Sequence, residues 1–438
     1  MNDACDLCRR RALEAVYRPD GSIRGLTVYL CRHCGLLQSV PRIDRAPRAA
    51  AAVSSGADWG NVRYGKGFRT HAAIAALKRH VDVTDALEVL DVGSNRGSFA
   101  RAFLDIAPEA HITAIEPDER VAQSCADLAR CEIVEARIED TALEGGRFDI
   151  VHSCHTIEHL AHPARVLADH WRTLKPGGLL LIDAPNTAIL DVEDMVEEWF
   201  IDKHLYHFSA RTLMRLVAST GFEVIAAPDT EDRENLLIVA RKAYTGFPAA
   251  SLDTREVEEA ERLVAAYVTN RARNLAALTH VAAAIQAMAP KRVAMWGAGR
   301  LFDTLVVHGR FVPTTLSLLI DSHLKAHVGE RHGCKLTGPE ALASANPDVV
   351  IVMSRGFAGE IAAEARRLAP LPVQVLPTSP EVLEILKGWG IRTFQSLAAL
   401  PQVALVERMG QEGLYLQKLT LGQVNRPLLT SEPLADFV

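Results

Sequence analysis

Two pairs of cysteines near the start of the chain have the spacing of a metal site. Cys5 and Cys8 are separated by two residues, as are Cys31 and Cys34, and 22 residues lie between the pairs. Two such C-x-x-C turns can present four thiolates to one ion and complete a tetrahedral site. A closed four-sulfur shell leaves no position for a substrate, so the pattern predicts structural zinc, with iron as the alternative.

A glycine-containing loop between two short apolar runs predicts a site for a nucleoside. The run 87–90 is typical of a buried strand, and a helix follows the loop from about Ser98. A second strand, 112–115, ends at an acid that can accept both hydroxyls of a ribose. The residues that we expect around this ligand are Asp91, Gly93, Asn95, Gly97, Glu116 and Pro117.

The details of the loop favour a ligand without a pyrophosphate. Dinucleotide-binding loops read G-x-G-x-x-G, whereas this loop reads D-V-G-S-N-R-G from residue 91. The acid before the loop suits a cationic amino-acid end. Downstream, 147–151 reads as the entry to a strand, 157–160 as a short turn, and 174–183 as a Pro-Gly-Gly turn into a buried strand.

In this order and spacing the segments resemble the motifs of class I S-adenosylmethionine-dependent methyltransferases, over roughly residues 65–245. The resemblance implies a Rossmann-like α/β domain that holds S-adenosylmethionine. The glycine loop would border the methionine part of the cofactor, and Glu116 would hold the ribose. The same resemblance places Ile138 and Glu139 near the adenine and His155 near the methionine portion.

The composition is that of an ordinary globular protein with several domains. The chain has 438 residues, 48% of them hydrophobic and 23% charged, and its net charge is −6. This balance does not favour a nucleic-acid partner or an anionic membrane surface. The N-terminus lacks the apolar core of a signal peptide, and no apolar run has the length of a membrane span, so we expect a cytoplasmic protein.

The pattern along the chain predicts an α/β protein in six parts. A zinc ribbon with a hairpin, 1–40, is followed by a linker or lid, 41–66, and by the methyltransferase domain, 67–245. A helical spacer, 246–289, leads to a smaller Rossmann-like domain, 290–395. That domain repeats the strand, glycine loop and strand-end acid at Gly297 and Asp321. We expect an irregular extension over 396–438.

This layout resembles the sugar C-methyltransferases, which carry a four-cysteine zinc module and methylate TDP-linked 4-keto-deoxysugars. The resemblance implies a small-molecule acceptor, with a nucleotide sugar as the expected class. It also implies that His204 is the catalytic general base, and His159, after the fourth strand, is the second candidate for that role. Histidine suits proton removal near neutral pH. Ile201 and Lys203 stand where that family has Tyr and Glu.

Three other functions stay open at this stage. Some rRNA methyltransferases carry N-terminal zinc modules, although the acidic balance argues against that substrate. An NAD-dependent oxidoreductase could use the loop at Gly297, which lacks the third glycine of a dinucleotide fingerprint. A binding protein could keep the cofactor fold without the chemistry, given the changes at Ile201 and Lys203.

Overall fold

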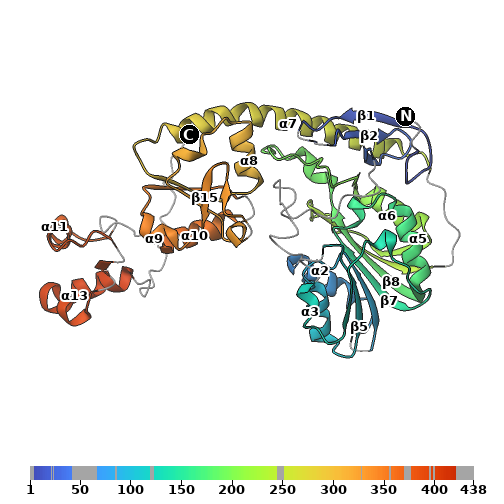
Figure 1. The fold of residues 1–438 in the computed structure, drawn as a ribbon, viewed down its shortest axis with the longest axis horizontal. Helices are drawn as coiled ribbons and strands as arrows, with labels where there is room; N and C mark the ends of the chain where they lie inside the picture. The colour runs from blue at the N-terminus through green and yellow to red at the C-terminus, as the bar shows by residue number, and fades with distance from the viewer. Residues whose placement is uncertain are drawn as a thin grey trace, which may run out of the picture. The chain divides into compact units, whose positions relative to one another are not determined.

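The computed structural model describes residues 4–20, 22, 24–41, 67–83, 86–118, 123–243, 251–326, 328–354, 357–368, 376–393, 396–397 and 400–420. Apart from residue 41, the predicted linker or lid lies outside these residues. The chain forms two compact units (Figure 1). The first consists of Met1–Val281 with Asp303–Arg310, and the second of Ala282–Phe302 with Phe311–Val438.

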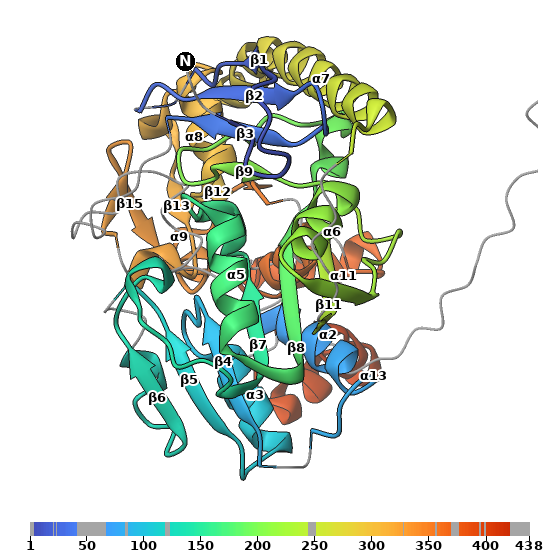
Figure 2. The same ribbon diagram turned by 90° about the vertical axis from the view of Figure 1, so that its right-hand side faces the viewer.

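An antiparallel N-terminal sheet carries the four cysteines. The predicted hairpin forms from β1 (Leu13–Tyr17) and β2 (Thr27–Cys31), and β3 (Leu37–Val40) pairs with β2. The fourth strand, β9 (Tyr206–His207), comes from a distant part of the chain and pairs with β3 (Figure 2). The cysteine segment therefore shares a sheet with the loop that precedes residue 206.

A seven-stranded sheet forms the centre of the first unit, in the order β10-β11-β8-β7-β4-β5-β6. The strand β11 is antiparallel to both of its neighbours, and the others run parallel. The order reverses at β4, which has β5 on one side and β7 on the other. Ligands bind at the carboxyl ends of the strands at such a point. The strands are β4 (Glu88–Val92), β5 (His111–Ile115), β6 (Cys131–Val134), β7 (Phe148–Cys154), β8 (Leu174–Pro185), β10 (Phe222–Ala226) and β11 (Asn235–Lys242).

Helices cover both faces of this sheet. On one face α2 (Gly67–Leu77) and α3 (Ser98–Ile106) bury Leu77 and Phe103 among the strand residues. On the other face α5 (Pro163–Thr173) and α6 (Ala210–Ser219) bury Leu167 and Leu216 (Figure 2). Short turns of 3-10 helix connect the layers: η2 (Gln123–Cys125), η3 (Ile138–Asp140), η4 (Ile157–His159) and η5 (Thr187–Asp191).

The predicted helical spacer is a single long helix, α7 (Thr254–Gln286). Its first half does more than connect, because it packs on the N-terminal sheet. Leu263 and Tyr267 of α7 share a buried cluster with Val28 and Leu30 of β2. The hydroxyl of Tyr267 donates to Glu198 Oε1 at 2.6 Å.

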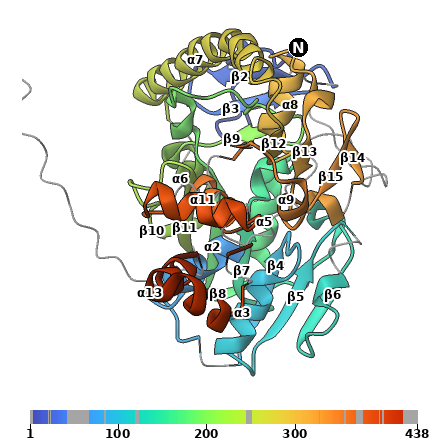
Figure 3. The same ribbon diagram turned by 90° about the vertical axis from the view of Figure 1, so that its left-hand side faces the viewer.

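The second unit is built on a five-stranded sheet in the order β14-β15-β13-β12-β16, parallel except for β14 (Figure 3). The expectation of an irregular segment after residue 395 is wrong for 402–420, which are helical with a kink at Gly410. Leu405 and Leu416 of that helix are buried with Leu386. The remaining elements are β12 (Val293–Trp296), α8 (Arg300–Val307), η6 (Pro313–Thr315), β13 (Leu318–Ile320), η7 (Leu324–Ala326), β14 (Glu330–Arg331), β15 (Cys334–Thr337), α9 (Ala341–Ala345), β16 (Val349–Val352), α10 (Ala358–Leu368), α11 (Pro380–Gly388) and α13 (Gln402–Thr420).

No helix among the described residues combines the length and the apolar character that crossing a membrane requires.

Candidate functional site

The glycine loop after β4 is held against the end of β5 by its backbone. The amides of Gly93 and Ser94 both donate to the carbonyl of Ile115, at 2.8 and 3.0 Å. Gly93, Asn95 and Gly97 all have positive φ, at 67°, 52° and 70°. A Cβ on Gly97 would overlap the Cys125 sulfur, so this position requires glycine for its conformation and for space.

Glu116, the predicted ribose ligand, is also bonded to the loop. Its Oε2 accepts from the amide of Asn95 at 2.9 Å, and its Oε1 accepts from the amide of Asp118 at 3.0 Å. Each carboxylate oxygen has two lone pairs, so these bonds leave acceptor capacity for sugar hydroxyls. The side chain is 4% exposed, and the neighbouring Pro117 is exposed. The assignment of the ribose to Glu116 stays a prediction.

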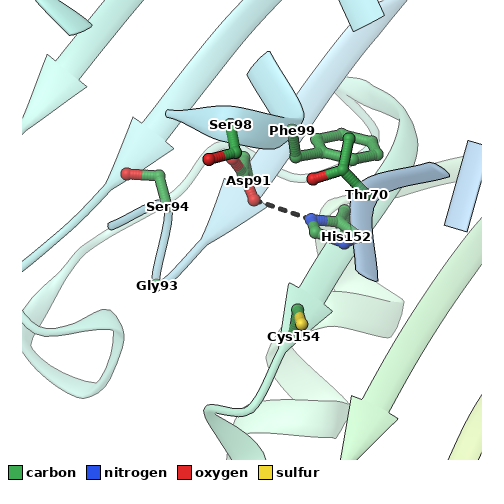
Figure 4. A pocket seen from close by; sticks show the side chains of 8 residues that line it. All are labelled: Thr70, Asp91, Gly93, Ser94, Ser98, Phe99, His152 and Cys154. Atoms are coloured by element: carbon green, nitrogen blue, oxygen red, sulfur yellow. Dashed lines mark hydrogen bonds and ion pairs between the residues drawn. The ribbon is translucent and has the colours of Figure 1, made fainter. Parts of the chain in front are cut away.

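Asp91 and His152 form a buried pair at the centre of the sheet edge (Figure 4). Asp91 Oδ1 lies 2.7 Å from His152 Nδ1, and the His152 ring stacks on Phe99 with centroids 3.7 Å apart. Asp91 is 1% exposed, and its Oδ2 has no hydrogen-bond partner among the described residues. A buried carboxylate oxygen of this kind suits a cationic group of a ligand. The pair lines a small pocket together with Thr70, Gly93, Ser94, Ser98, Phe99 and Cys154.

Arg69 was missed in the sequence and lies beside the same pocket. It binds Asp183 at the end of β8 through two nitrogens, at 2.5 and 2.9 Å, and Asp232 at 2.9 Å. The next residue, Thr70, lines the pocket. Asp183 could be noticed in the sequence, because it is an acid at the end of a buried strand. Arg69 had no local signal, because its partner is 114 residues away.

The two predicted catalytic histidines are brought together. The His159 and His204 rings lie 4.9 Å apart between centroids, in an edge-to-face arrangement. The amide of Leu205 donates to the carbonyl of Glu158 at 2.7 Å, which ties the two loops to each other. Glu158 itself is 1% exposed and lies next to both imidazole groups of its own loop. Their direct role in catalysis stays a prediction.

The three other predicted cofactor residues lie near the carboxyl edge of the sheet. His155 has a positive φ of 46°, and its Nε2 is 3.1 Å from Asn235 Oδ1. Ile138 belongs to the buried core beneath this edge. Glu139 Oε1 accepts from the amide of Ala161 at 2.9 Å. None of the three lines the pocket around Asp91. Their contacts with a cofactor stay predictions.

The four N-terminal cysteines converge on one point. Cys5 and Cys34 have sulfurs 3.5 Å apart, as do Cys8 and Cys31, and all four sulfurs lie within 4.8 Å of one another. Ligands about 2.3 Å from a tetrahedral zinc ion have sulfurs about 3.8 Å apart, so the cluster fits such an ion. Hydrogen bonding with Cys31 and burial raise the pKa of Cys34. Gly35 has a φ of 79°, as a cysteine turn requires.

Comparison with known proteins identifies the central domain. Residues 63–227 match a family model described as a methyltransferase domain. A Mycolicibacterium smegmatis protein named "Probable S-adenosylmethionine-dependent methyltransferase" is 29% identical over 159 residues, 36% of this chain and 59% of its own length. The 2-O-methyltransferase NoeI of Sinorhizobium fredii is 37% identical over 84 residues, 17% of this chain and 33% of its own length. The chain thus spans less than two thirds of the length of these curated relatives.

A solved structure from Mesorhizobium loti, an S-adenosylmethionine-dependent methyltransferase, aligns over 39% of this chain and 97% of its own. Its identity of 17% and TM-score of 0.33 add nothing to the family match. The segment that matches the family model includes the glycine loop after β4 and the point where the strand order reverses. Residues 63–227 therefore form a methyltransferase domain of the class I, S-adenosylmethionine-dependent type.

Proposed function

We propose that this protein transfers a methyl group from S-adenosylmethionine to a small-molecule acceptor, with a nucleotide-linked sugar as the acceptor class. The observation that carries the proposal is the buried Asp91 carboxylate, which has one oxygen without a partner among the described residues. The cofactor has a cationic amino group and a sulfonium, and either charge would stabilise that oxygen. The glycines of the neighbouring loop have no side chains, so the loop backbone can lie close to a ligand.

The methyl transfer requires that the acceptor atom is aligned with the carbon–sulfur bond and that the acceptor loses a proton. In the transfer, the acceptor atom forms a bond to the methyl carbon while the carbon–sulfur bond breaks, and its electron pair stays on sulfur. The products are the methylated acceptor, S-adenosylhomocysteine and one proton. The pair His159 and His204 lies beside the sheet edge that holds the pocket, where an imidazole could take that proton. The name of the relative NoeI, a 2-O-methyltransferase, supports oxygen as one acceptor atom.

Two measurements test the transfer. Calorimetry on the wild-type chain should give one S-adenosylmethionine site, and Glu116→Ala should weaken it strongly, because Glu116 also orders the loop through Asn95. Incubation with a panel of nucleotide sugars should then give a product heavier by one CH₂ unit in a mass spectrum. A chain that fails to bind S-adenosylmethionine at millimolar concentration would rule the proposal out.

The four N-terminal cysteines would hold a structural zinc ion. The ion would join the turns at Cys5 and Cys31, and the strand that follows the second turn is β3, which pairs with β9. Elemental analysis should find one zinc per chain, and Cys34→Ser should lose it. The matched control is Cys334→Ser, since Cys334 is a buried thiol outside this cluster. Iron in place of zinc, or zinc retained by Cys34→Ser, would contradict the assignment.

A further inference from the structure

A second group of metal-binding side chains lies at the carboxyl edge of the central sheet. Glu158, His159 and His204 each offer one ligand atom, and these atoms lie within 4.8 Å of one another. Two of the residues come from η4, directly after β7, and the third from the loop before β9. The set is two imidazoles and one carboxylate, which is the donor set of facial metal sites with open positions.

The backbone orients one of these imidazoles as a metal ligand is usually oriented. His159 Nδ1 lies 2.9 Å from the carbonyl oxygen of Lys203. A carbonyl can only accept, so Nδ1 carries a proton, and in the neutral form of the ring the lone pair is on Nε2, which faces Glu158. Metal-binding histidines commonly donate their other nitrogen to a backbone carbonyl in this way.

The spacing between the side chains fits ligands of one ion better than a hydrogen bond. His159 Nε2 lies 3.5 Å from Glu158 Oε1, which is longer than an ordinary N–H···O bond of about 2.7–3.2 Å. Two ligand atoms about 2.1 Å from a common ion lie about 3.4 Å apart at the tetrahedral angle. The Glu158 carboxylate is 1% exposed, and a buried carboxylate is stabilised by a cation.

A neighbouring group of similar composition does not carry the same argument. Cys154, His155 and Asp183 are also close enough to share an ion. However, Asp183 already binds Arg69 through both oxygens, and His155 Nε2 lies 3.1 Å from Asn235. An ion there would have to displace Arg69, whereas the hydrogen bond between the His159 imidazole and the Lys203 carbonyl uses the nitrogen turned away from Glu158.

We propose that Glu158, His159 and His204 bind a first-row divalent transition-metal ion. Three protein ligands leave positions open for an acceptor that bears a hydroxyl or keto oxygen. A bound cation lowers the pKa of such an oxygen, so the acceptor would lose its proton near neutral pH and then attack the methyl carbon. This inference rests on the proposed methyl transfer, and it assigns the imidazoles as ligands in place of a free base.

The experiment adds Mn²⁺ to protein that carries a single zinc ion per chain, at the four cysteines, and follows free Mn²⁺ by electron paramagnetic resonance, with Co²⁺ absorption as a second probe. Mn²⁺ prefers oxygen and nitrogen to a four-sulfur site. We expect one bound ion per chain and a loss of about tenfold or more in affinity for Glu158→Gln and for His204→Gln. His162→Gln, an exposed histidine of the same loop region, should bind like the wild type.

The outcomes separate this inference from the proposed function. The S-adenosylmethionine affinity of each variant, measured by calorimetry, should be unchanged and also shows that the variant is folded. If the wild type binds neither Mn²⁺ nor Co²⁺ at millimolar concentration, or if both variants bind like the wild type, the metal site is wrong. Turnover that survives a chelator would also overturn it, and the methyl transfer would then stand with an imidazole as the base.

Discussion

The two glycine loops of the chain use the same backbone arrangement. In the methyltransferase domain the Gly93 amide donates to the last residue of the second strand, Ile115, at 2.8 Å. In the smaller sheet the Gly297 amide donates to Ile320 at the same distance. The strand-end acid then accepts a loop amide in both, as Asp321 does from Ala298 at 3.0 Å. The loop and the acid therefore stabilise each other in both units.

The difference lies two residues before the first glycine. Asp91 pairs across the sheet with His152 of β7, and its counterpart Met295 pairs with Ile351 of β16. The first unit thus places a buried carboxylate and an imidazole at the point where strand order reverses, and the second places two apolar side chains there. A buried carboxylate beside an imidazole at this point marks a ligand site better than the glycine pattern does.

The largest effect is expected from a change in the pair formed by Asp91 and His152. Asp91→Asn removes the carboxylate that would face the cationic end of S-adenosylmethionine, and we expect its affinity to fall about a hundredfold, or about 3 kcal/mol. Calorimetry measures this directly. Asp321→Asn is the matched control and should leave the affinity unchanged. Equal losses in both variants would mean that the two loops do not differ as argued.

The second prediction compares the glycines themselves. A Cβ would overlap the Cys125 sulfur at Gly97 and the Met353 carbonyl at Gly297, and both positions have positive φ. Gly97→Ala and Gly297→Ala should each lower the free energy of unfolding by about 2–3 kcal/mol. Denaturant titration measures the loss of stability. Only Gly97→Ala should also weaken S-adenosylmethionine binding, and binding equally weakened by Gly297→Ala would contradict the comparison.

Local signals made much of the fold predictable. Ser209 has the side chain of a helix cap, and it forms a capping box with Thr212 at the start of α6. Gly221, which has a positive φ of 97°, separates that helix from β10. The two cysteine turns could be paired because metal ligation needs four thiolates in one place. Each of these features depends on residues close in sequence or on a ligand count.

The rest depends on contacts between distant residues, for which the chain has no local pattern. Arg69 reaches Asp183 over 114 positions, and β3 pairs with β9 at Leu37 and His207. His152 was visible only as one histidine among several near the end of a strand, and its pairing with Asp91 follows from the strand order. The register of the sheet decides which polar residues meet, and that register is set by packing of the whole domain.

The third prediction asks whether the contact between Arg69 of α2 and Asp183 supports the pocket. Arg69→Lys keeps the charge but loses the two-pronged contact with Asp183. We expect a loss of about 1–2 kcal/mol in unfolding free energy and a several-fold weaker S-adenosylmethionine affinity, since Thr70 lines the pocket. Asp232→Asn removes only the more exposed partner and should have a smaller effect. If Arg69→Lys changes the stability but not the affinity for S-adenosylmethionine, the contact of Arg69 with Asp183 does not support the pocket.

The smallest effect concerns acid sensitivity of the first unit. Burial lowers the pKa of His207 to about 3, so the folded chain keeps this imidazole neutral. The unfolded chain binds a proton below about pH 6.5, so stability falls as the pH drops from 6.5 toward 3. At pH 5.5 the loss from this group is about 1.4 kcal/mol relative to neutral pH.

His207→Gln should reduce that loss, because glutamine does not titrate and can still bond to Ser39, whose hydroxyl lies 2.9 Å from His207 Nε2. Denaturant titrations of both proteins at pH 7.5 and at pH 5.5 measure the difference. His170, which burial shifts to a pKa of about 4, remains in both proteins and cancels from the comparison. If the wild type and the variant lose the same unfolding free energy, protonation of His207 in β9 does not cause the acid sensitivity.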